Sequence, residues 1–167
     1  MLYGVAIDNN ILNLYFGMNK HQSKWALNNR YAEILINDLR KKKIPIYLPA
    51  PVVTESLCIF EDKNKRNEIF KKLQKDYRIL PFDTNAANIC AGILLDHDNL
   101  HQLRDADNPR KLIKTDAMIL AICKSWGVPK IYTNDKSMLK MQVNQLEICP
   151  LPKANVQIPL FPEEEAK

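Results

Sequence analysis

Residues 111–137 have the sequence KLIKTDAMILAICKSWGVPKIYTNDKS, and this stretch decides the fold class of the chain. Apolar side chains from Ile113 to Trp126 recur at helical spacing, which predicts a buried helix. Gly127 ends that helix, because glycine readily adopts the conformation found just beyond helix C-termini. Lys130 to Thr133 is then a short predicted strand. The stretch therefore predicts a helix followed by a strand, the repeating unit of α/β proteins.

Two aspartates stand at the ends of these elements. Asp116 is predicted to lie in the first turn of the helix, and Asp135 lies just past the end of the strand. In a parallel α/β sheet, ligands bind outside the carboxyl ends of the strands. Asp135 belongs to that edge, and whether Asp116 reaches it depends on the rest of the chain.

The remainder of the chain continues the alternation of strands and helices. This pattern predicts an α/β fold, a single-domain three-layer α/β/α sandwich with a mostly parallel central sheet over residues 1–150. Residues 151–167 are proline-rich and are predicted to form an extended C-terminal arm. The expected strands cover residues 2–7, 44–48, 77–82, 130–133 and 146–150. The expected helices cover residues 11–16, 23–43, 64–76, 84–95 and 113–126, with a further helix that has Pro51 in its first turn, and with Asn10 and Thr84 as N-caps.

Composition narrows the class of protein. The 167 residues are 46% hydrophobic, which is enough for a folded core, and carry a net charge of +5. A basic surface favours an acidic partner, of which nucleic acid is the commonest. Four cysteines without a CxxC pair are predicted to be buried free thiols in a reducing cytosol: Cys58, Cys90, Cys123 and Cys149. The start of the chain is unlike a signal peptide and no apolar run suits a membrane span, so we expect a cytoplasmic protein.

Four acidic residues lie near the ends of predicted strands. Two follow a strand, and two lie in a helix next to one. Like charges raise each other's pKa, so a protein that gathers carboxylates usually binds a divalent cation there. Carboxylate oxygens suit Mg²⁺ and Mn²⁺, and such an ion activates water and stabilises charge on a phosphate. The chemistry that this predicts is hydrolysis of a phosphodiester. The four residues are Asp8, Glu55, Asp116 and Asp135.

The sequence resembles the PIN-domain nucleases, and within them the VapC toxins of bacterial toxin–antitoxin pairs. The resemblance spans residues 1 to about 150 and rests on the order and spacing of four segments: VAIDNNIL (5–12), PAPVVTESL (49–57), LIKTDAMILAICKSWG (112–127) and KIYTNDKSM (130–138). It implies RNA as the substrate, Mg²⁺ or Mn²⁺ as the cofactor, a homodimer, and an antitoxin protein as a possible partner.

The resemblance also assigns roles to residues. It implies that Asp8, Asp116 and Asp135 ligate the metal, and that Glu55 is a further ligand or a base that orients water. Thr133, two residues before the last aspartate, would orient a ligand or phosphate. The family often has Thr or Ser after its first aspartate, where this chain has Asn9, and the resulting expectation is a tuned site.

Two further groups of residues have alternative interpretations. His97 and His101 have the spacing of a zinc-binding pair on a helix, but a solvated polar segment is the preferred reading. Cationic residues near this segment could border the path of RNA: Arg104, Arg110, Lys111 and Lys114. The basic runs at 40–43 and 63–75 could hold RNA phosphates or be ordinary solvated helix faces, and the latter is preferred for 40–43.

The leading hypothesis from the sequence is a metal-dependent endoribonuclease. The alternative is a non-catalytic RNA-binding or protein-assembly module of the same fold. No GxSxG, GxGxxG or GxxxxGK[ST] motif is present, which argues against a serine hydrolase or a nucleotide-binding fold.

Overall fold

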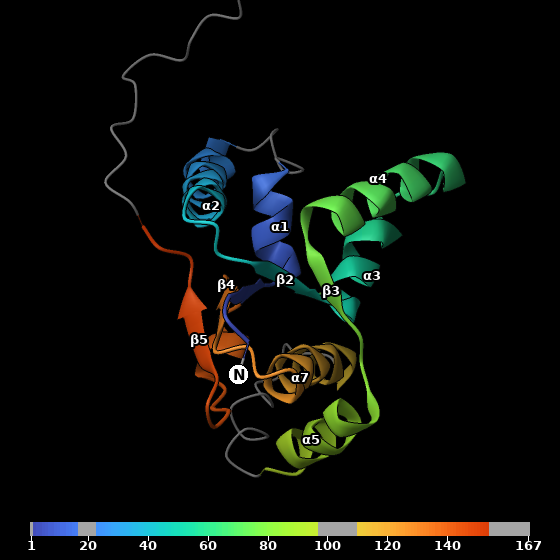
Figure 1. Ribbon diagram of the computed structural model, residues 1–167, viewed down its shortest axis with the longest axis vertical. Coiled ribbons are helices and arrows are strands. Elements are labelled where there is room, and N and C mark those ends of the chain that lie inside the picture. Colours follow the sequence, from blue (N-terminus) through green and yellow to red (C-terminus); the bar gives the residue numbers. More distant parts are fainter. Residues whose placement is uncertain (1, 17–22, 97–109, 154–167) are drawn as a thin grey trace, which may run out of the picture.

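Five short strands form one parallel sheet in the order β3-β2-β1-β4-β5 (Figure 1). We describe residues 2–16, 23–96 and 110–153 of a computed structural model, with the backbone alone for residues 23–26 and 110–113. The chain builds outward from β1 to β3 and then returns to place β4 on the other side of β1, which makes the β1/β4 boundary a topological switch point. The strands are β1 (Val5–Ile7), β2 (Ile46–Pro49), β3 (Arg78–Leu80), β4 (Lys130–Thr133) and β5 (Glu147–Pro150).

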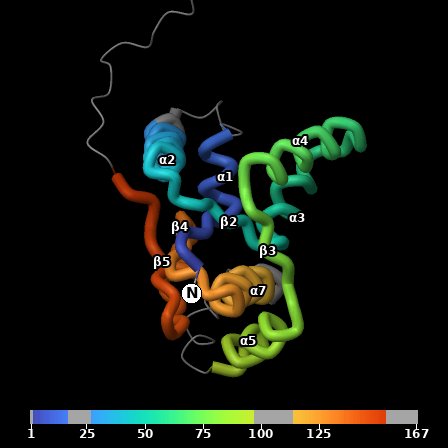
Figure 2. Tube along the Cα trace, in the orientation of Figure 1, coloured from blue at the N-terminus to red at the C-terminus, as the bar shows by residue number. Residues whose placement is uncertain are grey.

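Helices cover both faces of this sheet, as the sequence predicts. In Figures 1 and 2, α1, α2 and α4 lie on one side of the strands, and α5 and α7 lie on the other. Helix α3 contacts both α1 and α7, so it closes the layers at one edge. The helices are α1 (Asn9–Tyr15), α2 (Ser23–Lys41), α3 (Ala50–Cys58), α4 (Lys63–Asp76), α5 (Thr84–Leu95) and α7 (Arg110–Ser125), with a 3-10 turn, η1 (Met138–Lys140).

The core is built around β1, whose three residues are all buried. Helix α7 packs between the sheet and α5, and for this reason it buries Ala117 and the whole run from Ile119 to Cys123. On the opposite face, α1 buries Ile11, Leu12 and Leu14. A strand with both faces covered is apolar throughout, which is why VAI reads as a continuous apolar run.

Helix α7 begins earlier than predicted. It starts at Arg110, directly after Pro109, so Asp116 lies in the second turn and the expectation of a first-turn position was wrong. Trp126 lies beyond the end of the helix and its side chain is 38% exposed, contrary to its predicted place in the core. The indole Nε1 donates a hydrogen bond to the carbonyl oxygen of Pro81, which holds the ring at the surface.

Two helix caps also differ from prediction, for a common reason. Asp8, and not Asn10, caps α1, and Asp83, and not Thr84, caps α5. Each carboxylate accepts a hydrogen bond from a backbone N–H of the first turn: Asp8 from Asn9 at 2.6 Å and Asp83 from Ala86 at 2.7 Å. A carboxylate is a strong acceptor and suits the positive end of the helix dipole, so it takes the cap position from a neighbouring amide or hydroxyl.

The cysteines divide into two kinds. Cys90 and Cys123 are buried free thiols, as predicted, but Cys58 is exposed and Cys149 is half-buried. Cys58 is the last residue of α3 and lies on its outer side. His97, His101 and residues 154–167 of the predicted arm lie outside the described residues. No helix within the described ranges is both long enough and apolar enough to span a membrane.

Candidate functional site

Four different elements supply the four acidic side chains singled out in the sequence. Asp8 follows β1, Glu55 lies in α3, Asp116 lies in α7, and Asp135 follows β4. Strands β1 and β4 are parallel neighbours, with Ile7 paired to Tyr132, so Asp8 and Asp135 leave the sheet at the same edge. The charges of Asp8, Glu55 and Asp135 all raise the pKa of Asp116, so the four carboxylates share one region.

Asp8 is held at the centre of this region and is only 5% exposed. Its Oδ1 accepts the N–H of Asn9, and its Oδ2 accepts hydrogen bonds from the Thr133 hydroxyl at 2.8 Å and from the Asn10 amide at 2.7 Å. Burial nevertheless raises the pKa of Asp8 to about 6, because the cost of desolvating the charge exceeds what these hydrogen bonds recover.

Thr133 joins the two strand ends. Its side chain is wholly buried, and its Oγ1 donates to Asp8 while it accepts the backbone N–H of Asp135 at 3.0 Å. Asp135 itself uses Oδ1 to accept hydrogen bonds from the backbone N–H and hydroxyl of Ser137 and from the N–H of Met138. Thr133 therefore holds the Asp8 carboxylate and the backbone of Asp135, and it lies at the position where the resemblance predicts a ligand-orienting hydroxyl.

Asn10 belongs to the site, although the sequence predicts for it only the role of a helix cap. Its Nδ2 donates to Asp8 Oδ2 and, at 3.1 Å, to Thr133 Oγ1, and its Oδ1 accepts the N–H of Asn134 at 2.8 Å. One amide thus ties the start of α1 to the end of β4. Its place two residues after Asp8, where a helix begins, was the available signal, because a first-turn side chain can reach back to the preceding strand end.

Asn9 connects the first aspartate to α3. Its backbone N–H binds Asp8, and its Oδ1 accepts a hydrogen bond from the buried hydroxyl of Ser56 at 2.7 Å. Burial and the charge of Asp8 raise the pKa of Glu55, and a hydrogen bond with the Asn9 side chain lowers it. Asn9 therefore links Asp8, through its backbone N–H, to α3, the helix that carries Glu55, through its side chain. Ser56 was not singled out in the sequence.

Asp116 is the least compensated of the four acids. Burial, followed by the charges of Asp135, Asp8 and Glu55, raises its pKa from 3.8 to about 7. Among the described residues, the salt bridges are Arg40–Asp76, Lys42–Asp38 and Lys130–Glu147, so no Lys or Arg there forms one with a site acid. Within the described part of the chain, the region consequently concentrates negative charge without an ion-paired Lys or Arg to balance it.

This charge imbalance fits a bound divalent cation. Such an ion would stabilise the charged forms of Asp8, Glu55 and Asp116, whose pKa values are raised, and Mg²⁺ and Mn²⁺ prefer oxygen donors. As positioned, no group of three or more His, Cys, Asp or Glu side chains in the described part of the chain could hold a metal ion. The side chains would therefore have to move together to ligate one.

The predicted RNA-contacting residues are only partly described. Lys114 is exposed on α7, two residues before Asp116. Arg110 and Lys111 lie in the first turn of α7, but their side chains are outside the described set, and Arg104 is outside it altogether.

The comparisons with known proteins agree with this architecture. A family model described as the PIN domain matches residues 6–144, and the chain belongs to the PIN domain family. No curated protein matches the chain.

Several solved structures share the fold at low sequence identity. VapBC from Salmonella typhimurium, solved bound to DNA, has 14% identity over 90% of this chain and 100% of that chain, with a TM-score of 0.59. VapBC2 from Rickettsia felis, bound to a DNA fragment from its promoter, has 17% identity over 87% and 97%, with a TM-score of 0.54. Mycobacterium tuberculosis VapC20, a sarcin–ricin loop cleaving toxin, has 14% identity over 81% and 92%, with a TM-score of 0.52.

Proposed function

We propose that this chain is a metal-dependent endoribonuclease and the toxin of a toxin–antitoxin pair. The observation that carries the proposal is that four elements bring Asp8, Glu55, Asp116 and Asp135 to one region, where the charges of the other three raise the pKa of Asp116. A protein keeps four carboxylates in one region at a cost to stability, and a cation that binds them supplies the compensating free energy.

Asp8, Asp116 and Asp135 would hold a Mg²⁺ or Mn²⁺ ion, with Glu55 as a further ligand or as the group that orients water. When bound, the ion lowers the pKa of water and offsets charge on the phosphate in the transition state. Thr133 and Asn10 keep Asp8 Oδ2 in place at the edge of the sheet, and Asn9 fixes the side of α3 that carries Glu55. These contacts would hold Asp8 in place while the other carboxylates move in to complete the site.

RNA as the substrate and an antitoxin as the partner rest on the relatives. The similar M. tuberculosis protein is described as a sarcin–ricin loop cleaving toxin, and the Salmonella and Rickettsia structures are of VapBC and VapBC2. The resemblance to VapC toxins of toxin–antitoxin pairs supports an antitoxin as the partner. The net charge of +5 supports an anionic substrate. We further propose a homodimer, in line with the resemblance to VapC toxins.

The test is cleavage of total cellular RNA by the purified protein with Mn²⁺, with Mg²⁺ and with EDTA. We expect discrete fragments that require the metal and that are absent with Asp8→Asn. Mn²⁺ should also raise the melting temperature of the parent protein and leave that of Asp8→Asn/Asp116→Asn unchanged. A parent that neither cleaves RNA nor responds to Mn²⁺ would support the non-catalytic module instead.

A further inference from the structure

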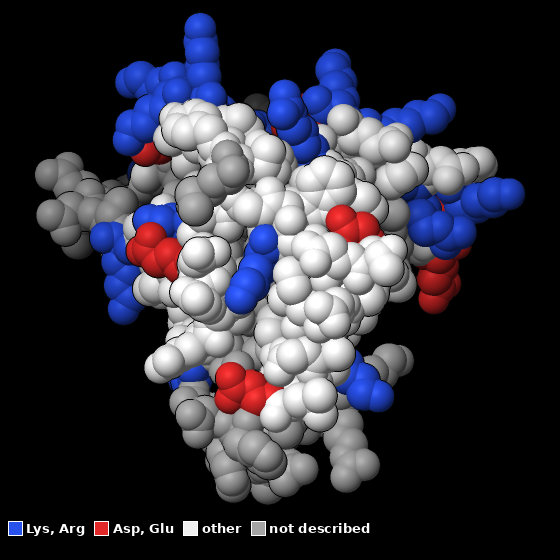
Figure 3. All heavy atoms as spheres, turned by 60° about the horizontal axis from the view of Figure 1, so that its bottom comes forward, with Lys and Arg blue, Asp and Glu red and all other residues white. Residues whose placement is uncertain are grey.

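Helix α4 presents a basic surface that the acid site does not use. Five of its lysines are exposed, against two acidic residues, Glu68 and Asp76, in the same helix. Figure 3 shows Lys and Arg side chains gathered along the upper and right margins of the face it displays, on the side where Figure 1 places α2 and α4. We refer to the exposed lysines as the α4 surface: Lys63, Lys65, Lys71, Lys72 and Lys75.

These lysines outnumber the carboxylates of the same helix by five to two. Among the described residues, none of the five forms a salt bridge, and Asp76 is within 3.7 Å of Arg40 on α2. An ordinary solvated helix usually alternates charges of both signs so that neighbours at i and i+4 attract each other. Lys71 and Lys75 have that spacing and repel, whereas Lys72 has Glu68 and Asp76 at that spacing. The surface thus keeps a positive potential that a polyanion would relieve.

Two lysines of the α4 surface reach aromatic rings just beyond the ends of α1 and α3, the helices next to Asp8 and Glu55. The ammonium group of Lys72 is 5.8 Å from the ring centroid of Phe16, just beyond α1, and that of Lys65 is 5.5 Å from the ring of Phe60, just beyond α3. Helix α1 has seven residues, so its two ends are roughly 10 Å apart. An RNA strand that leaves the acids therefore meets these lysines within a short distance.

The chemistry of the surface favours a nucleic-acid backbone over a protein partner. The large apolar residues of α4 face inward: Leu73 is buried, and Ile69 and Phe70 pack against the core. Its outward residues are lysine, amide and carboxylate, and they offer none of the aromatic or aliphatic anchors on which protein interfaces depend. Lysines that project from a helix without such anchors suit phosphates, which contribute affinity without sequence specificity.

We propose that the α4 surface is a second binding site for the RNA backbone, separate from the carboxylates that would carry out cleavage. The inference rests on the proposed function only for the choice of RNA as the polyanion. It assigns to α4 the non-specific, salt-dependent part of RNA affinity and leaves the chemistry to the acid site.

The experiment measures RNA binding without cleavage. In the Asp8→Asn background, Lys71→Gln/Lys72→Gln/Lys75→Gln would be compared with Arg30→Gln/Lys124→Gln/Lys153→Gln, which removes three positive charges elsewhere. Binding of a fluorescein-labelled single-stranded RNA 20-mer is followed by anisotropy from 50 to 300 mM salt, with EDTA present. We expect the α4 triple to weaken binding about tenfold at 150 mM and to lower the magnitude of the log–log salt slope by 1 to 2, and the control triple to change Kd less than threefold.

The outcomes separate this proposal from the proposed function. Equal losses of RNA affinity in the two triple variants would mean that only net charge matters, and would overturn the proposal. An unchanged Kd in the α4 triple would also overturn it, as would a lack of RNA binding by the Asp8→Asn parent. A parent protein that fails to cleave RNA would count against the nuclease and leave this binding test intact. Loss of an acidic protein partner in the α4 triple, with RNA affinity unchanged, would assign the surface to protein binding. Circular dichroism checks that both triples fold.

Discussion

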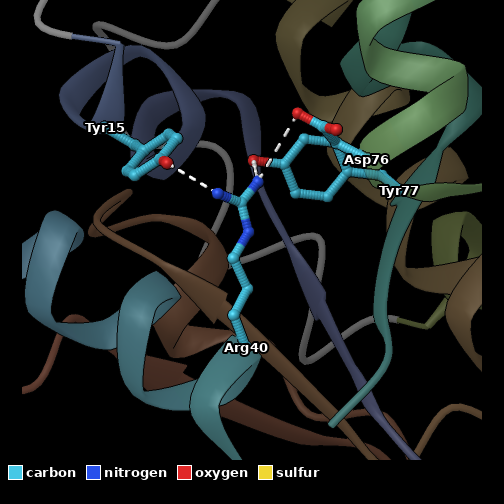
Figure 4. Close-up of polar contacts among 4 residues, drawn as sticks. All are labelled: Tyr15, Arg40, Asp76 and Tyr77. Atoms are coloured by element: carbon cyan, nitrogen blue, oxygen red, sulfur yellow. Dashed lines mark hydrogen bonds and ion pairs between the residues drawn. The ribbon is translucent and has the colours of Figure 1, made fainter. Parts of the chain in front are cut away.

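The chain arranges charge in two opposite ways, in the buried acid site and around the partly exposed Arg40. At the acid site, four carboxylates lie together without a salt bridge to any described Lys or Arg, and burial and mutual repulsion raise the pKa of Asp116 to about 7. Around Arg40, one cation is surrounded by groups that accept its hydrogen bonds and face its charge (Figure 4). The second arrangement stabilises the fold, whereas the first costs stability until a cation binds.

The Arg40 cluster joins three elements. The guanidinium donates to the hydroxyl oxygens of Tyr15 at 2.8 Å and Tyr77 at 3.3 Å, and its Nη2 is 3.7 Å from Asp76 Oδ2 (Figure 4). Its central carbon is also 5.4 and 5.6 Å from the centroids of the two tyrosine rings. The cluster therefore ties α2 to the end of α1 and to the junction of α4 with β3. Each partner either accepts a hydrogen bond from the guanidinium or carries the opposite charge, so the cluster is stable without a ligand.

The largest predicted effect is on the rate of RNA cleavage, which should fall for a substitution at the acid site and not for one at Arg40. Asp135→Asn should lower RNA cleavage about 1,000-fold, which corresponds to roughly 4 kcal/mol of transition-state free energy, because it removes a carboxylate proposed to bind the metal. Arg40→Gln should leave the cleavage rate within threefold at a temperature where both variants are folded. Single-turnover cleavage in Mn²⁺ gives both values. Equal losses of cleavage rate in Asp135→Asn and Arg40→Gln would contradict a catalytic role for the acid site and a structural role for Arg40.

The next effect concerns stability without metal. Since the pKa of Asp116 is raised from 3.8 to about 7 by folding, the stability that this group contributes is fully present below its unfolded pKa and is lost as pH rises through about 7. Asp116→Asn should therefore raise the free energy of unfolding at pH 8 in EDTA by roughly 2 kcal/mol, and by much less at pH 4. Urea denaturation at the two pH values tests this. A variant less stable than the parent at pH 8 would contradict it.

Substitution of Arg40 should lower the free energy of unfolding, whereas substitution of Asp116 should raise it. Arg40→Ala should lower the free energy of unfolding by about 2 kcal/mol, because it removes two hydrogen bonds and the packing of the guanidinium against both tyrosine rings. The ion pair with Asp76 is partly exposed and adds little. Arg40→Lys should recover less than half, since an ammonium lacks the planar group that contacts both rings. The Mn²⁺-induced rise in melting temperature should survive in Arg40→Ala, and its loss would mean that the two regions are coupled.

The sequence was a good guide to the sheet and to the acids, because both depend on local order. VAI before Asp8 and KIYT ahead of Asn134-Asp135 mark strand ends directly, and parallel strands bring their carboxyl ends to one edge. The match of the PIN domain model to residues 6–144 confirms the family inferred from those segments. Whether the four acids act in catalysis stays a prediction.

Contacts between distant segments could not be predicted in this way. The Arg40 contacts span 25 and 37 residues, and the Thr133–Asp8 bond spans 125, so no local pattern reports them. Cys58 was misjudged for a related reason. Its neighbours in the sequence are apolar, but α3 turns Val52, Val53 and Ser56 inward and leaves Cys58 exposed. Burial in a short helix depends on which face meets the core, and that depends on tertiary packing.

The smallest effect tests the hydrogen bond that joins the strand ends. Thr133→Val keeps the shape of the side chain but removes the hydroxyl that donates to Asp8 Oδ2 and accepts the N–H of Asp135. Because this hydrogen bond lowers the pKa of Asp8, its loss should raise that pKa above about 6 and cost about 1 kcal/mol of stability. Thr133→Ser keeps the hydroxyl and should preserve the pKa. Titration of the Asp8 carboxyl by NMR in metal-free protein reports it directly. An Asp8 pKa that is the same in both variants would show that the Thr133 hydroxyl does not stabilise the Asp8 carboxylate, and would remove the contrast in hydrogen bonding that sets Asp8 apart from Asp116.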